Sequence, residues 1–263
     1  MDRRDFLKIA GVSAAGLGAK PALDLLLGAP SAEAKTERPP IVKGKHWAMV
    51  VDMRKLTEED VHAAVTACHT VHNVPLVRGA DGKPDAKREI KWLWADHFEH
   101  VFPDEASEYR ARNLMDREFL VLCNHCTNPP CVRVCPTQAT YKREDGIVMM
   151  DMHRCIGCRF CMAGCPYGSR SFNYYDPRLF LGTNPPNPAY PTRSKGVVEK
   201  CCFCVERLEE GLAPACVEAC HSGALAFGDL ASPSSKVRQL IAEAPSIRRK
   251  LSLGTGPNVY YII

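Results

Sequence analysis

Cysteines at fixed spacing are the residues of this chain with the clearest chemistry. The chain has 263 residues and 14 cysteines, and most of the cysteines fall into three runs of four. The runs are Cys123-x2-Cys126-x4-Cys131-x3-Cys135-Pro136, Cys155-x2-Cys158-x2-Cys161-x3-Cys165-Pro166 and Cys201-x2-Cys204-x11-Cys216-x3-Cys220. The second run has the spacing with which thiolates hold a cubane iron–sulfur core, including the proline after its last cysteine. The runs therefore predict bound [4Fe–4S] clusters and electron transfer.

The first two runs are predicted to exchange their last cysteines. In proteins with two such clusters, the fourth cysteine of one run ligates the cluster of the other run. Both fourth cysteines here precede a proline, which favours the same exchange. One predicted cluster takes Cys123, Cys126, Cys131 and Cys165. The other takes Cys155, Cys158, Cys161 and Cys135.

The elements that must position these cysteines are predicted to form four related units. Each unit opens with a short apolar strand, and further apolar or aromatic runs close the third and fourth units. These segments are 47–51, 119–122, 147–150, 171–175, 197–198 and 224–227. Strand, cysteine loop and short helix then repeat, which indicates an α+β fold of tandem ferredoxin-like (4Fe–4S dicluster) units with long connecting loops.

The first unit has lost its cysteine loop. Residues 52–55 align with residues 151–154, but the cysteines that follow Arg154 have no counterparts after Lys55. Thr57 instead starts a predicted helix with acidic residues in its first turn. Its apolar positions recur at i, i+3, i+4 and i+7, as one helix face requires. Those positions are Val61, Ala64, Val65 and Cys68.

Cys68 is therefore the predicted fourth ligand of a third cluster. If the fourth unit exchanges its last cysteine with the first unit, its cluster takes Cys201, Cys204, Cys216 and Cys68. Cys220 is then spare, and Cys202 is a bystander between two ligands. The alternative is a local set that uses Cys220, with Cys68 as an ordinary buried thiol. Either choice predicts three [4Fe–4S] clusters.

The N-terminus predicts export. Arg3-Arg4, a weakly apolar stretch at 9–19 and a small-x-small site at Ala32-Glu33-Ala34 resemble a Tat signal. The alternative is an amphipathic helix that stays attached. No later segment has 18 apolar residues. The predicted segments are a leader (1–34), the altered first unit with an insertion (35–118), a two-cluster core (119–175), a Pro-rich loop with the fourth unit (176–231) and a C-terminal extension (232–263).

Two long connections and the tail have less specific sequences. Residues 76–118 are polar, with Trp92 and Trp94 as expected anchors, and the prolines of 176–196 exclude regular secondary structure. Both connections are expected either to dock partners or to cover the clusters. The tail is expected to hold a helix around 236–242 and a last segment, 259–263, that is either an edge strand or a partner-binding segment.

Other chemistries receive less support from the sequence. A disulfide scaffold is the alternative use of cysteines after export, but four close cysteines in repeated runs favour cluster ligation. His125, between two ligands, either donates a hydrogen bond or proton near a cluster or is held by packing. The histidines of the predicted helix, His62, His69 and His72, suggest a zinc site without a further ligand. A net charge of +4 gives no argument for nucleic-acid binding, and no catalytic motif or substrate pocket is evident.

The cysteine motifs resemble a known family. They resemble the iron–sulfur subunits of respiratory complexes related to polysulfide reductase, DMSO reductase and the NrfC-type nitrite-reduction proteins. The resembling segments are Leu122–Val132, Arg154–Gly168, Lys200–Cys204 and Pro214–Cys220. The resemblance covers 46–228 and implies an electron-carrier subunit rather than a catalytic one. Family members usually hold four clusters, and this chain departs from them at its first unit.

Further segments resemble one subfamily, the periplasmic DsrO subunits of DsrMKJOP complexes. They are 67–75, 89–92, 100–103 and the twin-arginine leader. That resemblance implies a location on the periplasmic face of the cytoplasmic membrane and a role in dissimilatory sulfur metabolism. The implied partners are an NrfD-type (DsrP) quinone-interacting membrane subunit, the multihaem cytochrome DsrJ and the DsrMK module. Two alternatives stay open: the electron-transfer arm of a periplasmic molybdopterin oxidoreductase such as polysulfide reductase, and a freely diffusing polyferredoxin.

Overall fold

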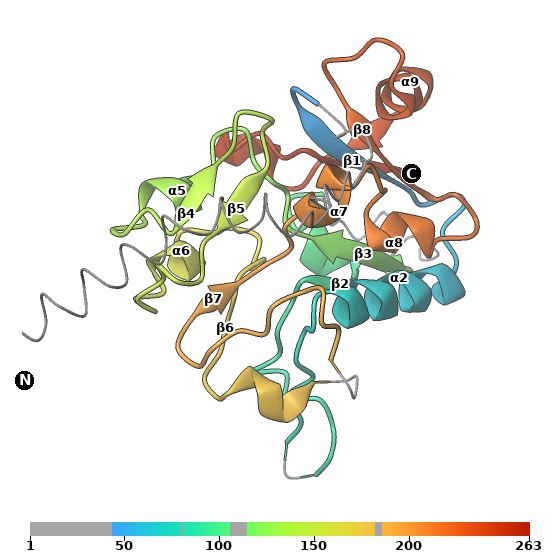
Figure 1. Cartoon of the computed structure of the whole chain (residues 1–263). Coiled ribbons are helices and arrows are strands. Elements are labelled where there is room, and N and C mark those ends of the chain that lie inside the picture. The colour runs from blue at the N-terminus through green and yellow to red at the C-terminus, as the bar shows by residue number, and fades with distance from the viewer. Residues whose placement is uncertain (1–43, 80, 106–114, 182–185) are drawn as a thin grey trace, which may run out of the picture. The chain divides into compact units, whose positions relative to one another are not determined.

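The structure is a computed structural model, and it describes residues 44–79, 81–105, 115–181 and 186–263. These residues belong to one compact unit, Pro39–Ile263 (Figure 1). The predicted leader at 1–34 lies outside the described residues, so the expectation of a Tat signal stays a prediction. Among the residues that the structure describes, no helix has the length and apolar character needed to span a membrane.

A four-stranded sheet with the order β8-β1-β10-β9 supports one side of the fold. Its strands are β1 (Trp47–Asp52), β8 (Leu225–Asp229), β9 (Ser246–Ile247) and β10 (Val259–Ile262). Strand β1 runs parallel to β10 and antiparallel to β8. Every residue of β1 is buried, as is typical of a strand covered on both faces. Met49 and Val51 face the main core, whereas Ala48 and Val50 face a smaller cluster that includes Val237.

The C-terminal segment has a more central position than the sequence predicts. The expectation of an edge strand is wrong, because β10 lies between β1 and β9 and pairs with both. The preceding helix, α9 (Lys236–Glu243), was expected at 236–242 and packs against β8 and β1. The sequence shows that Val259-Tyr-Tyr-Ile-Ile263 is apolar, but its partner on one side, β1, is more than 200 residues away and has no local signal.

Helix α2 (Glu58–Val71) occupies the position of the missing cysteine loop, as predicted. Thr57 caps it with a capping box: its hydroxyl accepts from the backbone N–H of Asp60, and the Asp60 carboxylate accepts from the backbone N–H of Thr57. Val61, Ala64 and Cys68 are buried on one face. The other Asp60 carboxylate oxygen accepts the backbone N–H of Ser222 at 3.2 Å, which ties the start of α2 to the loop after Cys220.

The long connection 76–118 contains regular structure that its polar composition hides. Its described part includes β2 (Leu93–His97) and α3 (Phe98–Val101), and β2 pairs antiparallel with β3 (Glu118–Leu122). Trp92 and Trp94 are buried, as expected of anchors. Strand β3 brings Leu120 and Leu122 into the main core and ends directly before Cys123.

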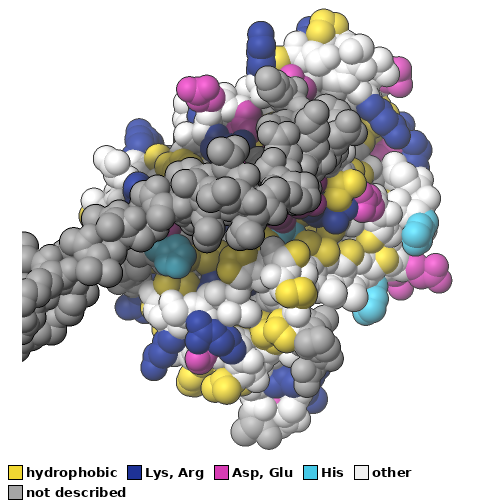
Figure 2. All heavy atoms as spheres, viewed as in Figure 1, with side chains coloured by type: hydrophobic (Ala, Val, Ile, Leu, Met, Phe, Trp, Pro, Cys, Tyr) yellow, Lys and Arg dark blue, Asp and Glu magenta, His cyan; other side chains and the backbone are white. Residues whose placement is uncertain are grey.

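The remaining elements are short and alternate with the cysteine loops. The strands are β4 (Thr140–Lys142), β5 (Val148–Met150), β6 (Ser171–Phe172) and β7 (Val198–Glu199). The helices are α5 (Pro130–Arg133), α6 (Phe160–Ala163), α7 (Val205–Glu209) and α8 (Ala215–Glu218), with the 3-10 turns η1 (Pro177–Phe180) and η2 (Leu251–Leu253). Strand β4 pairs with β5, and β6 pairs with β7. On the face visible in Figure 2, Lys and Arg side chains are interspersed with Asp and Glu.

Candidate metal centres

The structure gathers one set of four cysteines at the end of β3, which we call the middle group. Its members are Cys123, Cys126, Cys131 and Cys165. They line one pocket, Cys131 from helix α5 and Cys165 from the segment after α6. Burial raises the pKa of the Cys126 thiol to about 12, and the charges of the other three cysteines contribute. These four thiols are the set that the sequence predicts for one cluster.

A second set lies near helix α6, and we call it the outer group. Its members are Cys135, Cys155, Cys158 and Cys161. Burial raises the pKa of Cys161, and among the charges that act on this thiol are those of Cys155 and Cys131. The described contacts of Cys135 are local, with its sulfur accepting the backbone N–H of Thr140 at 3.5 Å. Cys135 and Cys158 therefore belong to this group on sequence grounds.

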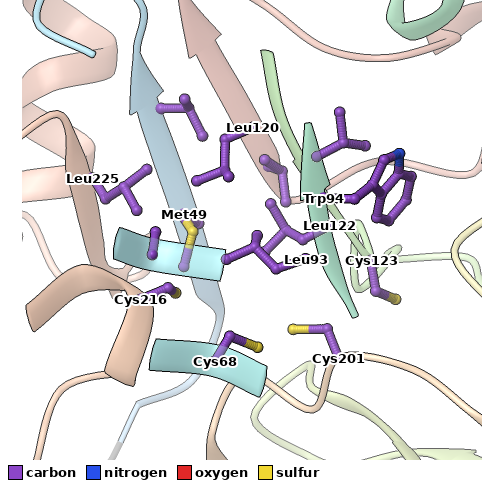
Figure 3. Close-up of a cluster of buried hydrophobic side chains, with 14 of the residues drawn as sticks. Met49, Cys68, Leu93, Trp94, Leu120, Leu122, Cys123, Cys201, Cys216 and Leu225 are labelled. Atoms are coloured by element: carbon purple, nitrogen blue, oxygen red, sulfur yellow. The ribbon is translucent and has the colours of Figure 1, made fainter. Parts of the chain in front are cut away.

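A third set lies against the main core, and we call it the inner group. Its members are Cys68, Cys201, Cys204 and Cys216. Helix α2 packs against α8, which brings Cys68 towards Cys216. Burial raises the pKa of Cys201 and of Cys216, and in both the charge of Cys68 is the next largest cause. Figure 3 shows the sulfur atoms of Cys68 and Cys201 pointing towards each other beside the core.

Cys220 has a different environment from the inner group. Its thiol is buried, and its sulfur lies 3.6 Å from the hydroxyl oxygen of Ser222. The thiols that act most strongly on Cys201, Cys204 and Cys216 include Cys68 in each case, and Cys220 in none. The choice of the fourth ligand stays a prediction, but the geometry is the one that favours Cys68.

The three groups follow one another in the order inner, middle, outer. Cys201 of the inner group lies within electrostatic reach of Cys123 of the middle group. Cys131 of the middle group has the same relation to Cys161 of the outer group. Exposure increases along this order, because the four inner thiols are buried whereas Cys158 is exposed. The arrangement therefore connects a buried site to a site at the protein surface.

The groups around these thiols fit an anionic cofactor that accepts hydrogen bonds. All 14 cysteines are free thiols, so the structure gives no support to a disulfide scaffold. Buried nitrogen atoms without a hydrogen-bond partner in the described part of the chain include Asn124 Nδ2, His125 Nε2 and Arg170 Nη2. Asn124 and Arg170 line the pocket of the middle group. Donors left free beside thiols are what sulfur atoms of a bound cluster would accept.

His125 is held in place by packing and by one hydrogen bond. Its Nδ1 accepts the backbone N–H of Val148 at 3.1 Å, and its ring stacks on Phe203 with centroids 3.7 Å apart. Burial, followed by the charges of Lys200 and Arg170, lowers the pKa of His125 well below its ordinary value. The ring is therefore neutral, with its proton on the unpartnered Nε2, which makes His125 a hydrogen-bond donor next to the cysteines.

The helix histidines do not form the suggested zinc site. His69 Nε2 lies 3.2 Å from the carbonyl oxygen of Leu93, and His62 is exposed. His72 Nδ1 donates to the carbonyl oxygen of Cys68 at 2.9 Å, and its Nε2 lies 2.6 Å from Glu206 Oε1. The three side chains thus have separate partners.

His72 instead belongs to a polar network beside the inner group, which sequence reasoning missed. His72, Cys204 and Glu206 bring their ligand-type atoms within 4.8 Å of one another. Cys202 joins them, with its sulfur 3.5 Å from Glu206 Oε2 and 3.8 Å from His72 Nε2. The one local signal of this network in the sequence is the i, i+4 spacing of Cys202 and Glu206 around the start of α7. Cys202 thus contacts this network, and its place outside the cluster ligands stays a prediction.

Comparison with known proteins agrees with the cysteine geometry. A model of the 4Fe-4S dicluster domain matches residues 118–230. The chain is 39% identical over 286 residues to the Hdr-like menaquinol oxidoreductase iron-sulfur subunit 1 of Archaeoglobus fulgidus, a match that covers 99% of this chain and 97% of that protein.

Two further relatives extend the comparison. The menaquinone reductase iron-sulfur cluster-binding subunit of Nitratidesulfovibrio vulgaris is 36% identical over 241 residues, covering 82% of this chain and 88% of that protein. The Protein NrfC homolog of Haemophilus influenzae is 35% identical over 222 residues, covering 84% and 81%.

Thiol groups of this kind in a dicluster domain define an iron–sulfur electron carrier. The chain belongs to the NrfC-type family of iron–sulfur subunits of oxidoreductase complexes. The sequence-based expectations of this family, of [4Fe–4S] cofactors and of a ferredoxin-like domain with mixed α and β content are confirmed.

Proposed function

We propose that this chain is the electron-transfer subunit of a membrane-bound quinone oxidoreductase complex and holds three [4Fe–4S] clusters. The observation that carries the proposal is the succession of inner, middle and outer thiol groups. When bound, the clusters supply one-electron redox chemistry. The chain's own residues do the rest: cysteine thiolates hold the iron, buried donors orient towards the sulfur atoms, and the apolar core keeps water from the inner group.

The proposed ligand sets follow the three groups. The middle cluster takes Cys123, Cys126, Cys131 and Cys165. The outer cluster takes Cys155, Cys158, Cys161 and Cys135. The inner cluster takes Cys201, Cys204, Cys216 and Cys68, supported by the electrostatic contact between Cys68 and two of the other members. Cys220 stays unused, as part of a fourth unit whose partner site α2 has filled.

Paired substitutions test the inner ligand set. Cys68→Ser and Cys220→Ser are purified without oxygen, and iron, sulfide and the low-temperature EPR spectrum of the reduced protein are measured. Cys68→Ser is expected to lose or convert one cluster, whereas Cys220→Ser keeps the wild-type iron content of about 12 atoms, four per cubane. The opposite result would assign the ligand to Cys220. Cys202→Ser is the matched control, because it removes a neighbouring buried thiol outside the proposed set.

The organisation of the chain supports tandem units. We propose the leader at 1–34, the altered first unit at 35–118, the two-cluster core at 119–175, the fourth unit at 176–231 and an extension at 232–263. Strand β1 of the first unit pairs with β8 of the fourth unit, the same two units whose cysteines form the inner group. The extension adds β9 and β10 to the sheet, and Val259 and Tyr261 of β10 belong to the same core cluster as three cysteines of the inner group.

The proposed membrane partner is a quinone-interacting subunit of the NrfD type. Two relatives are named for menaquinol or menaquinone chemistry, and both match most of this chain. The test is purification of an affinity-tagged chain from detergent-solubilised membranes, followed by addition of a reduced menaquinone analogue. Cluster reduction in the copurified complex, and not in the isolated chain, is expected. Recovery of the chain alone from the soluble fraction would favour a diffusing polyferredoxin.

Within this class we propose a DsrO-type subunit on the periplasmic face of the membrane, with DsrP, DsrJ and the DsrMK module as partners in dissimilatory sulfur metabolism. The support is the resemblance of 67–75, 89–92 and 100–103, and the twin-arginine leader supports Tat export. Mass spectrometry of the copurified proteins tests the partners. A trihaem cytochrome among them is expected, whereas a molybdopterin subunit would identify the alternative, the arm of an enzyme such as polysulfide reductase.

A further inference from the structure

Two buried cations lie among the thiol groups without a carboxylate partner in the part of the chain that the structure describes. Arg170 is 4% exposed and Lys200 is 2% exposed. Ser171 pairs with Glu199 in the β6–β7 ladder, so Arg170 and Lys200, the next residue on each strand, leave the same end of that ladder. The neighbouring acid, Glu199, is already bound to Arg193 and to the indole N–H of Trp92.

Arg170 lies between the middle and outer groups. Its Nη1 donates to the hydroxyl oxygen of Thr140 at 3.1 Å, and its Nη2 has no hydrogen-bond partner among the described residues. The side chain lines the pocket of the middle group. Burial acts to lower the pKa of Arg170, but the thiolates of Cys131, Cys161 and Cys123 raise it. Those thiolates belong to both groups, so the guanidinium faces both sites.

Lys200 lies between the middle and inner groups. Its Nζ donates to two carbonyl oxygens, that of Cys201 at 2.7 Å and that of Val148. Cys201 belongs to the inner group, and Val148 lines the pocket of the middle group. Neutral carbonyls solvate the ammonium but do not balance its charge. These two carbonyls place the ammonium beside the inner and the middle thiol groups, while the adjacent Glu199 is bound to Arg193 and Trp92.

A buried charge without a partner costs several kcal/mol, so the fold retains one only where an opposite charge compensates it. Four thiolates outweigh the positive charge of a cubane core, and each one-electron reduction makes the centre more negative. A fixed cation nearby stabilises the reduced form, and low local polarity increases the effect. Two cations thus alternate with three anionic centres along the protein.

We propose that Arg170 and Lys200 are electrostatic positioning residues that raise the reduction potentials of the clusters on either side of them. Arg170 acts on the middle and outer clusters, and Lys200 acts on the middle and inner clusters. The middle cluster is then stabilised in its reduced form from both sides. This inference rests on the proposed three clusters and adds residues that are not ligands.

Redox titration followed by EPR tests the proposal in the full-length protein. Arg170→Met is expected to lower the midpoint potentials of two clusters and to leave the inner one unchanged. Lys200→Met is expected to lower those of the inner and middle clusters and to leave the outer one unchanged. The expected shift is at least tenfold in the redox equilibrium, which is about 59 mV for a one-electron couple. The proposal requires that each variant leaves one midpoint potential unchanged, because a general loss of structure would shift the potentials of all three clusters.

Two further variants separate charge from shape. Arg170→Lys keeps the charge and is expected to restore the potentials at least in part. Arg154→Met removes an exposed cation beside Cys155 and is expected to change no potential, because solvent screens that charge. Equal shifts in Arg170→Met and Arg170→Lys would overturn the proposal. Loss of iron in the neutral variant alone would support a charge role, and loss of iron in both would overturn it.

Iron and sulfide analysis of the wild-type protein distinguishes this proposal from the proposed function. If the wild-type protein lacks three EPR-active centres, the proposed cluster count is wrong. If it has all three and neither Met variant moves a potential, only the role of Arg170 and Lys200 is wrong.

Discussion

The inner and outer thiol groups have similar cysteine motifs but opposite surroundings. The inner thiols are between 3% and 8% exposed, and Cys68, Cys201 and Cys216 lie in the main core with Leu225 and Met49. In the outer group Cys158 is exposed, and the neighbouring Ile156 and Phe160 are 67% and 60% exposed. The inner group takes its fourth member from a helix far away in sequence, whereas the outer group takes all four from 135–161. One site is therefore part of the fold's core, and the other is a local feature of its surface.

The largest expected difference is in stability. Cys216→Ser is expected to remove roughly a third of the iron, since each cubane holds four iron atoms. It should also lower Tm by on the order of 10 °C, because it breaks a link between remote segments that lie within the core. Cys158→Ser is expected to change Tm by only a few degrees. Calorimetry and iron analysis of both variants, prepared without oxygen, measure this, and equal losses of Tm would remove the distinction.

A second expected difference is in chemical access. Oxidants and chelators that act from solvent should destroy the outer cluster severalfold faster than the inner one, because only the outer group has an exposed thiol. EPR spectra taken at intervals during treatment with ferricyanide and EDTA follow each centre. Simultaneous loss of all centres would show that the clusters decay by global unfolding instead.

A third prediction concerns the cap of the helix that carries Cys68. Thr57→Ala removes the capping box at the start of α2 and is expected to cost about 1 kcal/mol in the free energy of unfolding. Thr66→Ala, at an exposed position on the same helix, should stay within about 0.5 kcal/mol of wild type. Denaturant titration compares the two. Similar values would mean that the cap does not anchor α2.

A fourth prediction is a pH dependence from His69, also on α2. Burial lowers the pKa of His69 to about 4 from its ordinary value of 6.5. Between these values the unfolded chain takes up a proton that the folded protein does not, so His69 makes the protein less stable as pH falls from 6.5 towards 4. His69→Gln is expected to flatten this part of the stability profile. Urea titrations between about pH 5 and 7 measure the free energy of unfolding of both proteins. An unchanged pH dependence in His69→Gln would contradict the role given to His69.

Much of the arrangement of the thiol groups could be predicted from local sequence. Cysteine spacing gave the middle group in full, and the capping residues with the apolar face of α2 brought Cys68 to the right side of its helix. The parts that sequence could not supply depend on contacts between distant segments. Strand β10 becomes central only through β1, and the carboxylate partner of His72, Glu206, comes from α7, 134 residues away. Among the described residues, the lack of a carboxylate partner for Arg170 and Lys200 is likewise a property of packing, since both look like ordinary basic residues in the sequence.

The place of β10 in the sheet sets an order of assembly. Strand β1 is among the first described elements and β10 is the last, yet they pair directly over Met49–Asp52. The sheet that backs the inner group is therefore complete only after β10 has been synthesised. All cysteines of the middle and outer groups lie within 123–165 and emerge much earlier. A metal-loading machinery that follows synthesis would therefore meet the middle and outer sites first, and the inner site with its supporting sheet only after β10.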